Sequence, residues 1–200
     1  MTDRGLWLFL GDSITQGVRH THGRRIYPQL IEDRIRAELA RYEQVFVNAA
    51  VNGSTVEDFV AGDSTPLWGL RPTVCSIMFG VNDSQAGADA ATAYGEHLVG
   101  LVRRAAESGA TVVLHVPTPV VGEQRTGPRA SLPRYAQLAR DVAAAEGAIL
   151  VDHDAAFLGA AGPGATDLMD DDLHPNARGH ELIASAMLEA MRRAPGSGWV

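Results

Sequence analysis

Short apolar segments of strand length recur five times along the chain, with helix-like segments between them. Gly, Pro, Asn or Asp bounds each one, and the later four contain many β-branched residues, as buried strands do. The predicted strands are 6–10, 45–51, 74–79, 111–116 and 148–151. Apolar side chains also recur at three- and four-residue intervals, the period of one helix face, over 27–39, 94–105, 132–142 and 182–191.

Strands that alternate with helices predict an α/β protein with a parallel sheet covered on both faces. The pattern fixes no strand order. There is no internal repeat or long linker, so we expect a single domain over 1–193 and a C-terminal tail over 194–200 that extends from it. Two connections are long, 117–130 and 159–170, and both are candidate pocket walls because long loops in compact domains are often functional.

Composition narrows the function classes. The chain has 200 residues, 46% of them hydrophobic and 20% charged, as in an ordinary globular domain. Its net charge of −7, with no basic run to offset it, opposes binding to nucleic acid or to an anionic membrane. All 17 basic residues are Arg, so a catalytic lysine is excluded.

The single cysteine and the apolar segments indicate where the protein works. Cys75 cannot form an internal disulfide, and its apolar neighbours predict an inert, buried thiol. The first apolar run, 6–10, is shorter than the ~7–15 residues of a signal-peptide core. No segment approaches the roughly 20 apolar residues of a membrane span. We therefore expect a cytoplasmic protein without a membrane span.

Polar motifs follow the predicted strands or precede the last helix. Gly-Asp-Ser occupies 11–13, Gly-Val-Asn-Asp occupies 80–83, and Asp-Asp-Leu-His-Pro-Asn occupies 171–176. Ligands of an open parallel sheet bind beyond the carboxyl ends of its strands, and all these segments fall on that edge. The residues predicted to meet there are Ser13, Gly53, Asn82, Asp171 and His174.

A serine, a histidine and an acid are the parts of an acyl-transfer site. A serine hydroxyl becomes a nucleophile when a base takes its proton, and His174 is the best base available to Ser13. Asp171 lies three residues before His174, close enough for one turn to bring carboxylate and imidazole into contact. Pro175 and Asn176 fit a helix start directly afterwards. Taken alone, this segment is equally compatible with a capping turn.

Together, Gly-Asp-Ser-Ile, Gly-x-Asn-Asp and Asp-x-x-His-Pro-Asn resemble the motifs of the SGNH, or GDSL-type, family of serine esterases and lipases. The resemblance implies a three-layer α/β/α, flavodoxin-like domain with a parallel five-stranded sheet. It also implies an oxyanion hole made by the backbone N–H groups of Ser13 and Gly53 and the side-chain amide of Asn82. Asp12 and Asp83 belong to the motifs, and we expect structural hydrogen bonds from them.

The leading hypothesis is therefore a serine hydrolase that cleaves short acyl or acetyl esters through an acyl-enzyme. Thioesterases, lysophospholipases, carbohydrate deacetylases and acyltransferases use the same residues, so these alternatives stay open. The alternative outside enzymes is a flavodoxin-like module that binds an anion or nucleotide. Neither Gly-x-Gly-x-x-Gly nor a P-loop occurs, which disfavours it. The expected partner is a small ester, and the sequence does not determine the oligomeric state.

The remaining histidines are weaker candidates. His20 and His22 lie in an Arg-rich stretch soon after Ser13, where a solvated loop is favoured over a pocket rim. His115 ends the fourth predicted strand and is a candidate for lining the site. No zinc motif such as His-Glu-x-x-His or paired Cys-x-x-Cys occurs, so we predict no metal and no cofactor.

Overall fold

One parallel sheet forms the centre of the molecule. The computed structural model describes residues 4–17, 19–62, 64–162 and 166–195. Within these ranges the strands are β1 (Leu6–Gly11), β2 (Val45–Asn48), β3 (Val74–Met78), β4 (Thr111–His115) and β5 (Ile149–Val151). Their order is β2-β1-β3-β4-β5, and every neighbouring pair is parallel. The five predicted strands are confirmed, and the order is that of flavodoxin-like sheets.

Helices follow or connect these strands. The described α-helices are α1 (Ser13–Gln16), α2 (Tyr27–Asp33), α3 (Val56–Ala61), α4 (Thr65–Gly69), α5 (Ala91–Glu107), α6 (Gly122–Thr126), α7 (Leu132–Glu146), α8 (His153–Ala161) and α9 (Ala177–Arg193). The other helical segments described are the π-helix η1 (Arg34–Glu38) and the 3₁₀ helices η2 (Asp83–Ala86) and η3 (Thr166–Leu168). The four predicted helical segments correspond to α2 with η1, α5, α7 and α9.

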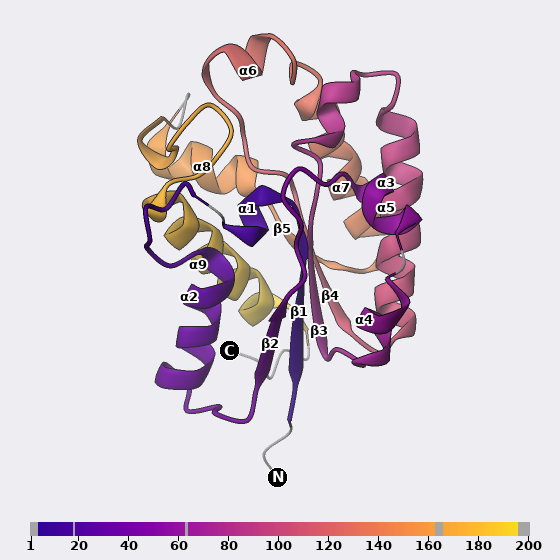
Figure 1. The fold of residues 1–200 in the computed structure, drawn as a ribbon, viewed down its shortest axis with the longest axis vertical. Coiled ribbons are helices and arrows are strands. Elements are labelled where there is room, and N and C mark those ends of the chain that lie inside the picture. Colours follow the sequence, from indigo (N-terminus) through magenta and orange to yellow (C-terminus); the bar gives the residue numbers. More distant parts are fainter. Residues whose placement is uncertain (1–3, 18, 63, 163–165, 196–200) are drawn as a thin grey trace.

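The elements form three layers (Figure 1). Helices α2, α8 and α9 pack together on one face of the sheet, and α3, α5 and α7 pack together on the other. Helices α1 and α6 lie near the carboxyl ends of the strands. The predicted α/β/α arrangement is confirmed, and the candidate residues that follow the strands share this edge.

Burial explains the apolar runs that predict the strands. Both faces of the sheet are covered, so consecutive side chains of a central strand are buried: Trp7 to Leu10 on β1 are at most 1% exposed. Every residue of β3 is buried too, whereas the edge strand β2 is partly exposed. Cys75 lies within β3, and burial raises the pKa of its thiol, as expected for an inert core residue.

The two long connections contain more helix than the sequence indicates. Helix α6 interrupts 117–130, and α8 continues to Ala161, inside the segment 159–170. Helix α6 buries none of its residues, so it has no apolar stripe to reveal it. Residues 196–200 of the predicted tail lie outside the described residues. Among the helices that the structure describes, none has the length and hydropathy that crossing a bilayer requires.

Candidate active site

Ser13 is held at a tight strand-to-helix junction. It is the first residue of α1, directly after β1, and Asp12 caps the helix by accepting a hydrogen bond of 2.9 Å from the Ile14 N–H. At Gly11, a Cβ would lie 2.8 Å from the Met78 carbonyl oxygen of β3, so this position admits no side chain. Gly17 ends the helix in the left-handed region, at φ 73°. These constraints fix Ser13 at the carboxyl edge of the sheet.

The 171–176 loop is fixed from its far end by Asn176. This residue is the N-cap of α9, and its side-chain oxygen accepts hydrogen bonds from the backbone N–H groups of Arg178 and Gly179. Its side-chain nitrogen donates to the carbonyl oxygens of Asp167 and Met169, on the segment that precedes the loop. The predicted helix start after His174 is confirmed, and it anchors the histidine that precedes it.

The structure brings Ser13, His174 and Asp171 together. The Ser13 Oγ lies 3.0 Å from His174 Nε2. On the other side of the ring, His174 Nδ1 lies 2.9 Å from Asp171 Oδ2 and 3.0 Å from Oδ1. Asp171 Oδ1 also accepts hydrogen bonds of 2.8 Å from the Leu173 N–H and 2.7 Å from the His174 N–H. One carboxylate thus orients both the imidazole and the loop that carries it.

The same contacts set the charge of Asp171. Burial raises its pKa, but the hydrogen bonds from the Leu173 N–H, the His174 ring and the His174 N–H outweigh this, and the pKa lies below the ordinary value. An ionised carboxylate beside Nδ1 favours the tautomer with its proton on Nδ1. The Nε2 lone pair then faces the Ser13 hydroxyl, which is the orientation that a general base requires.

Gly53 and Asn82 lie on neighbouring loops at the same edge. The Asn82 side chain donates a hydrogen bond of 3.1 Å to the Ser54 carbonyl oxygen. Two residues earlier, the Asn52 N–H donates to Gln16 Oε1 on α1, at 3.0 Å. The loop that carries Gly53 is therefore bonded to α1 on one side and to Asn82 on the other. Gly53 has φ 79°, in the left-handed region that favours glycine.

Asp12 and Asp83 are buried beneath these loops. Asp83 accepts a hydrogen bond of 2.9 Å from the Val56 N–H at the start of α3, and Asp12 caps α1, so both make the expected structural hydrogen bonds. Burial raises the pKa of Asp12 to about 7 and that of Asp83 to about 6. The negative charge of Asp83 contributes further to the shift at Asp12.

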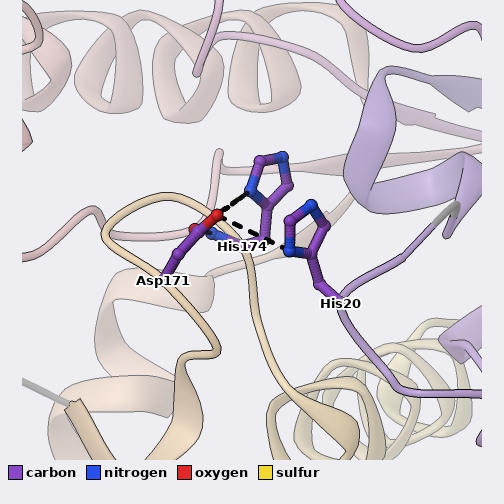
Figure 2. A group of neighbouring side chains, drawn as sticks. All are labelled: His20, Asp171 and His174. Carbon is purple, nitrogen blue, oxygen red and sulfur yellow. Dashed lines mark hydrogen bonds and ion pairs between the residues drawn. The ribbon is translucent and has the colours of Figure 1, made fainter.

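His20 is part of the site, contrary to the solvated-loop interpretation. Its ring stacks on that of His174, with centroids 3.7 Å apart and planes at 1°, as Figure 2 shows. Its Nδ1 lies 3.1 Å from Asp170 Oδ2 and 3.5 Å from Asp171 Oδ2. The side chain of His22 is 78% exposed, and its Nε2 lies 2.6 Å from Asp170 Oδ1. No sequence pattern signals the stacking, because the two rings come from residues 154 positions apart.

His115, in contrast, does not line the site. It is fully buried, with Nε2 2.9 Å from Ser76 Oγ and Nδ1 2.9 Å from His153 Nε2. Burial, and to a smaller extent His153, lowers its pKa well below the ordinary value. The side chain of His115 belongs to a polar network in the core, since the inward face of a central strand lies beneath a helix layer. The site-lining prediction was therefore wrong.

A groove of about 370 Å³ lies between α6, α7 and α8, and none of the five candidate site residues lines it. Five residues of 117–130, from Pro119 to Arg129, and Gly162 of 159–170 line it, so both predicted pocket walls contribute to it. The Val121 N–H donates a hydrogen bond of 2.9 Å to the Asp172 carbonyl oxygen, which ties the groove wall to the 171–176 loop. Its apolar lining includes Pro119, Val120, Leu132, Ala136, Phe157 and Leu158.

Comparisons with known proteins identify the family and related folds. The profile of the GDSL-like Lipase/Acylhydrolase family matches residues 9–182. An acetylxylan esterase of Geobacillus stearothermophilus is 27% identical over 96% of this chain and 94% of its own length. The crystal structure of LAE5, an alpha/beta hydrolase from the metagenome of Lake Arreo, superposes with a TM-score of 0.76 at 28% identity, covering 95% of this chain and 97% of that one. The crystal structure of the acetylxylan esterase Axe2 from G. stearothermophilus has the same fold, with a TM-score of 0.81 at 24% identity, covering 100% of this chain and 99% of that one.

Proposed function

The chain belongs to the GDSL-like lipase/acylhydrolase family and is a carboxylic ester hydrolase, and from this premise we propose that it removes short acyl groups, acetyl groups of carbohydrates in particular, through an acyl-enzyme on Ser13. The observation that carries the proposal is the continuous hydrogen-bonded chain from Ser13 Oγ through the His174 ring to Asp171. The acetyl preference is supported by the similarity to an acetylxylan esterase along nearly the whole of both chains.

In the first half of the reaction, Ser13 Oγ bonds to the ester carbonyl carbon while its proton moves to His174 Nε2. Asp171, ionised and bonded to Nδ1, stabilises the resulting imidazolium. When the tetrahedral intermediate collapses, the carbon–oxygen bond to the alcohol breaks. The leaving alcohol takes the proton from Nε2, and the acyl group stays on Ser13.

In the second half, water attacks the acyl-enzyme and gives its proton to His174 Nε2. The Ser13 oxygen then leaves, recovers that proton and releases the carboxylic acid. The negative oxygen formed at each attack requires donors, to which we assign the Ser13 N–H, the Gly53 N–H and the second amide N–H of Asn82. The first amide N–H of Asn82 donates to Ser54, which fixes the orientation of the amide.

The groove between α6, α7 and α8 supports a second candidate, a preference for longer acyl chains. Its volume and apolar lining suit an alkyl chain, and its wall is bonded to the 171–176 loop. Leu158 on its rim is 58% exposed and can be changed without disturbing the core. This provides a variant that separates the two substrate classes.

The test is a rate panel on the acetate, butyrate and octanoate esters of p-nitrophenol, an acyl thioester and acetylated xylo-oligosaccharides. We expect acetyl esters to be the fastest and Ser13→Ala to abolish hydrolysis of all of them with the fold intact. Leu158→Asp should leave the acetate rate unchanged. A maximum at octanoate that Leu158→Asp removes would replace the acetyl preference with the longer-chain one. Full turnover by Ser13→Ala would refute the mechanism.

We also propose that the protein works in the cytoplasm on a small ester rather than on nucleic acid. An unbridged, buried Cys75 suits a reducing compartment, and a net charge of −7 disfavours polyanions. Fractionation of cells that express the untagged chain tests the location. Recovery of the activity in the secreted fraction would contradict it.

A further inference from the structure

Three side chains at the candidate site present metal-ligating atoms to one another. One ring nitrogen of His20, one of His174 and a carboxylate oxygen of Asp171 lie within 4.8 Å of one another, and Figure 2 shows the three side chains. The Asp171 Oδ2 is 2.9 Å from the Nδ1 of His174 and 3.5 Å from that of His20. Both rings thus point the same nitrogen toward one carboxylate.

The two distances to the shared carboxylate oxygen are close to those of a tetrahedral zinc site. With zinc bonds of about 2.1 Å, neighbouring ligand atoms lie about 3.4 Å apart, and the two nitrogen–oxygen distances fall on either side of that value. We propose that His20, Asp171 and His174 bind Zn²⁺ and that the bound ion reversibly inhibits the enzyme. Because the two stacked rings lie in parallel planes, their in-plane lone pairs do not converge. The His20 ring therefore turns out of the stack to direct its lone pair to the ion, which lies between the two nitrogens and the carboxylate. Water completes the coordination.

The surroundings favour a cation that arrives from solvent. The three side chains are 25%, 44% and 17% exposed for His20, Asp171 and His174, so an ion can reach them. The Asp170 carboxylate, 3.1 Å from His20 Nδ1, adds a second negative charge beside the ion. Two imidazoles with one carboxylate suit zinc, whereas Mg²⁺ and Ca²⁺ require oxygen ligands almost exclusively. Selectivity for zinc over Mg²⁺ and Ca²⁺ follows.

Inhibition follows from the tautomer, and this step rests on the proposed role of His174. Catalysis needs the ring proton on Nδ1 and the lone pair of Nε2 toward Ser13. A neutral imidazole that binds zinc through Nδ1 carries its proton on Nε2 instead. That N–H faces Ser13 as a donor and cannot accept the hydroxyl proton. Zinc binding and proton transfer therefore exclude one another.

A binding experiment tests the site without reference to activity. Zinc is titrated into Ser13→Ala in competition with a chromophoric chelator, and the same background then carries His20→Phe, which keeps a stacked ring but removes the ligand. We expect one zinc per chain and a loss of affinity of at least about tenfold with His20→Phe. His97→Phe, a change of the same kind on α5, is the matched control, and His20→Gln gives the same ranking with a smaller side chain. Equal affinity in the His20 and His97 variants overturns the site.

An activity experiment tests the inhibition. In the chain with Ser13 intact, zinc should inhibit ester hydrolysis, EDTA should restore it, and Mg²⁺ at the same concentration should have no effect. The inhibiting concentration should rise at least about tenfold in His20→Phe, relative to that variant's own rate without metal. Zinc that binds with full activity retained overturns the inhibition. An inactive wild type with intact zinc binding would refute the proposed function alone.

Discussion

Three consecutive aspartates, Asp170, Asp171 and Asp172, provide a controlled test of the orienting carboxylate. Replacing each by Asn removes the same charge from the same loop, so only the contacts differ. Asp171 contacts the His174 ring, Asp170 contacts His20 and His22, and Asp172 accepts a hydrogen bond of 3.1 Å from the Glu123 N–H. We expect Asp171→Asn to be much the most damaging to kcat.

The magnitude follows from the atoms involved. In Asp171→Asn, the amide oxygen can replace Oδ1 and keep the backbone N–H groups of Leu173 and His174, so the loop is retained. The amide nitrogen then replaces Oδ2 opposite His174 Nδ1 and presents a donor to it. The ring is driven to the tautomer with its proton on Nε2, and the cation loses its carboxylate. Such a change can cost up to about 10⁴-fold in a triad, and we expect at least roughly tenfold in kcat, or about 1.4 kcal/mol of barrier.

The assay is kcat for p-nitrophenyl acetate in all three variants, with melting curves to verify that each is folded. Asp170→Asn and Asp172→Asn should change kcat by less than about threefold, which is well under 1 kcal/mol. If either of them is the most damaging, the acid has been misplaced. If Asp171→Asn stays within threefold of the wild type, the tautomer argument is wrong.

Three further predictions concern the metal, the thiol and the core histidines. Activity should survive EDTA, and a loss that one added metal restores would contradict a metal-free mechanism. Cys75→Ser should leave kcat unchanged. It should lower the free energy of unfolding by about 1–3 kcal/mol in urea denaturation, because it buries a hydroxyl in an apolar strand. Lost activity in the folded variant would point to a reactive thiol. Burial lowers the pKa of His153 to about 3, so this side chain stays neutral in the folded protein. In the unfolded chain it gains a proton below about pH 6.5, so the free energy of unfolding decreases as the pH is lowered. The stability difference between His153→Gln, which does not titrate, and the wild type should therefore shift by about 1.4 kcal/mol in favour of the variant between pH 7.5 and 5.5; a constant difference in urea denaturation would refute this.

Local patterns predicted much of this protein. Buried strands in a parallel sheet are apolar along their whole length, so the sequence shows all five of them. The spacing of Asp171 and His174 permits their contact, because three residues form about one turn, and the resemblance to the family motif favoured that pair over a simple capping turn. The order of the strands in the sheet could not be predicted in this way. It depends on which strands pair across long connections, and the residue pattern within a strand does not indicate its neighbours.

The missed contacts are those between distant segments. His20 lies 154 residues from His174, and only the fold of the loop after α1 brings the rings together. His115 sits at the end of an active-edge strand and still faces the core, where His153 supplies its partner from another element. The sequence alone does not distinguish a histidine at the site from a histidine in the core. The surrounding packing decides which one becomes part of the site.

The most direct test of the account is covalent labelling of the nucleophile. The protein is treated with a sulfonyl fluoride or a phosphonate ester, digested, and examined by mass spectrometry alongside Ser13→Ala and Asp171→Asn. The account predicts one label per chain, on Ser13, with no label in Ser13→Ala and slower labelling in Asp171→Asn. Complete inactivation by a label on any other residue, with Ser13 unmodified, would contradict it.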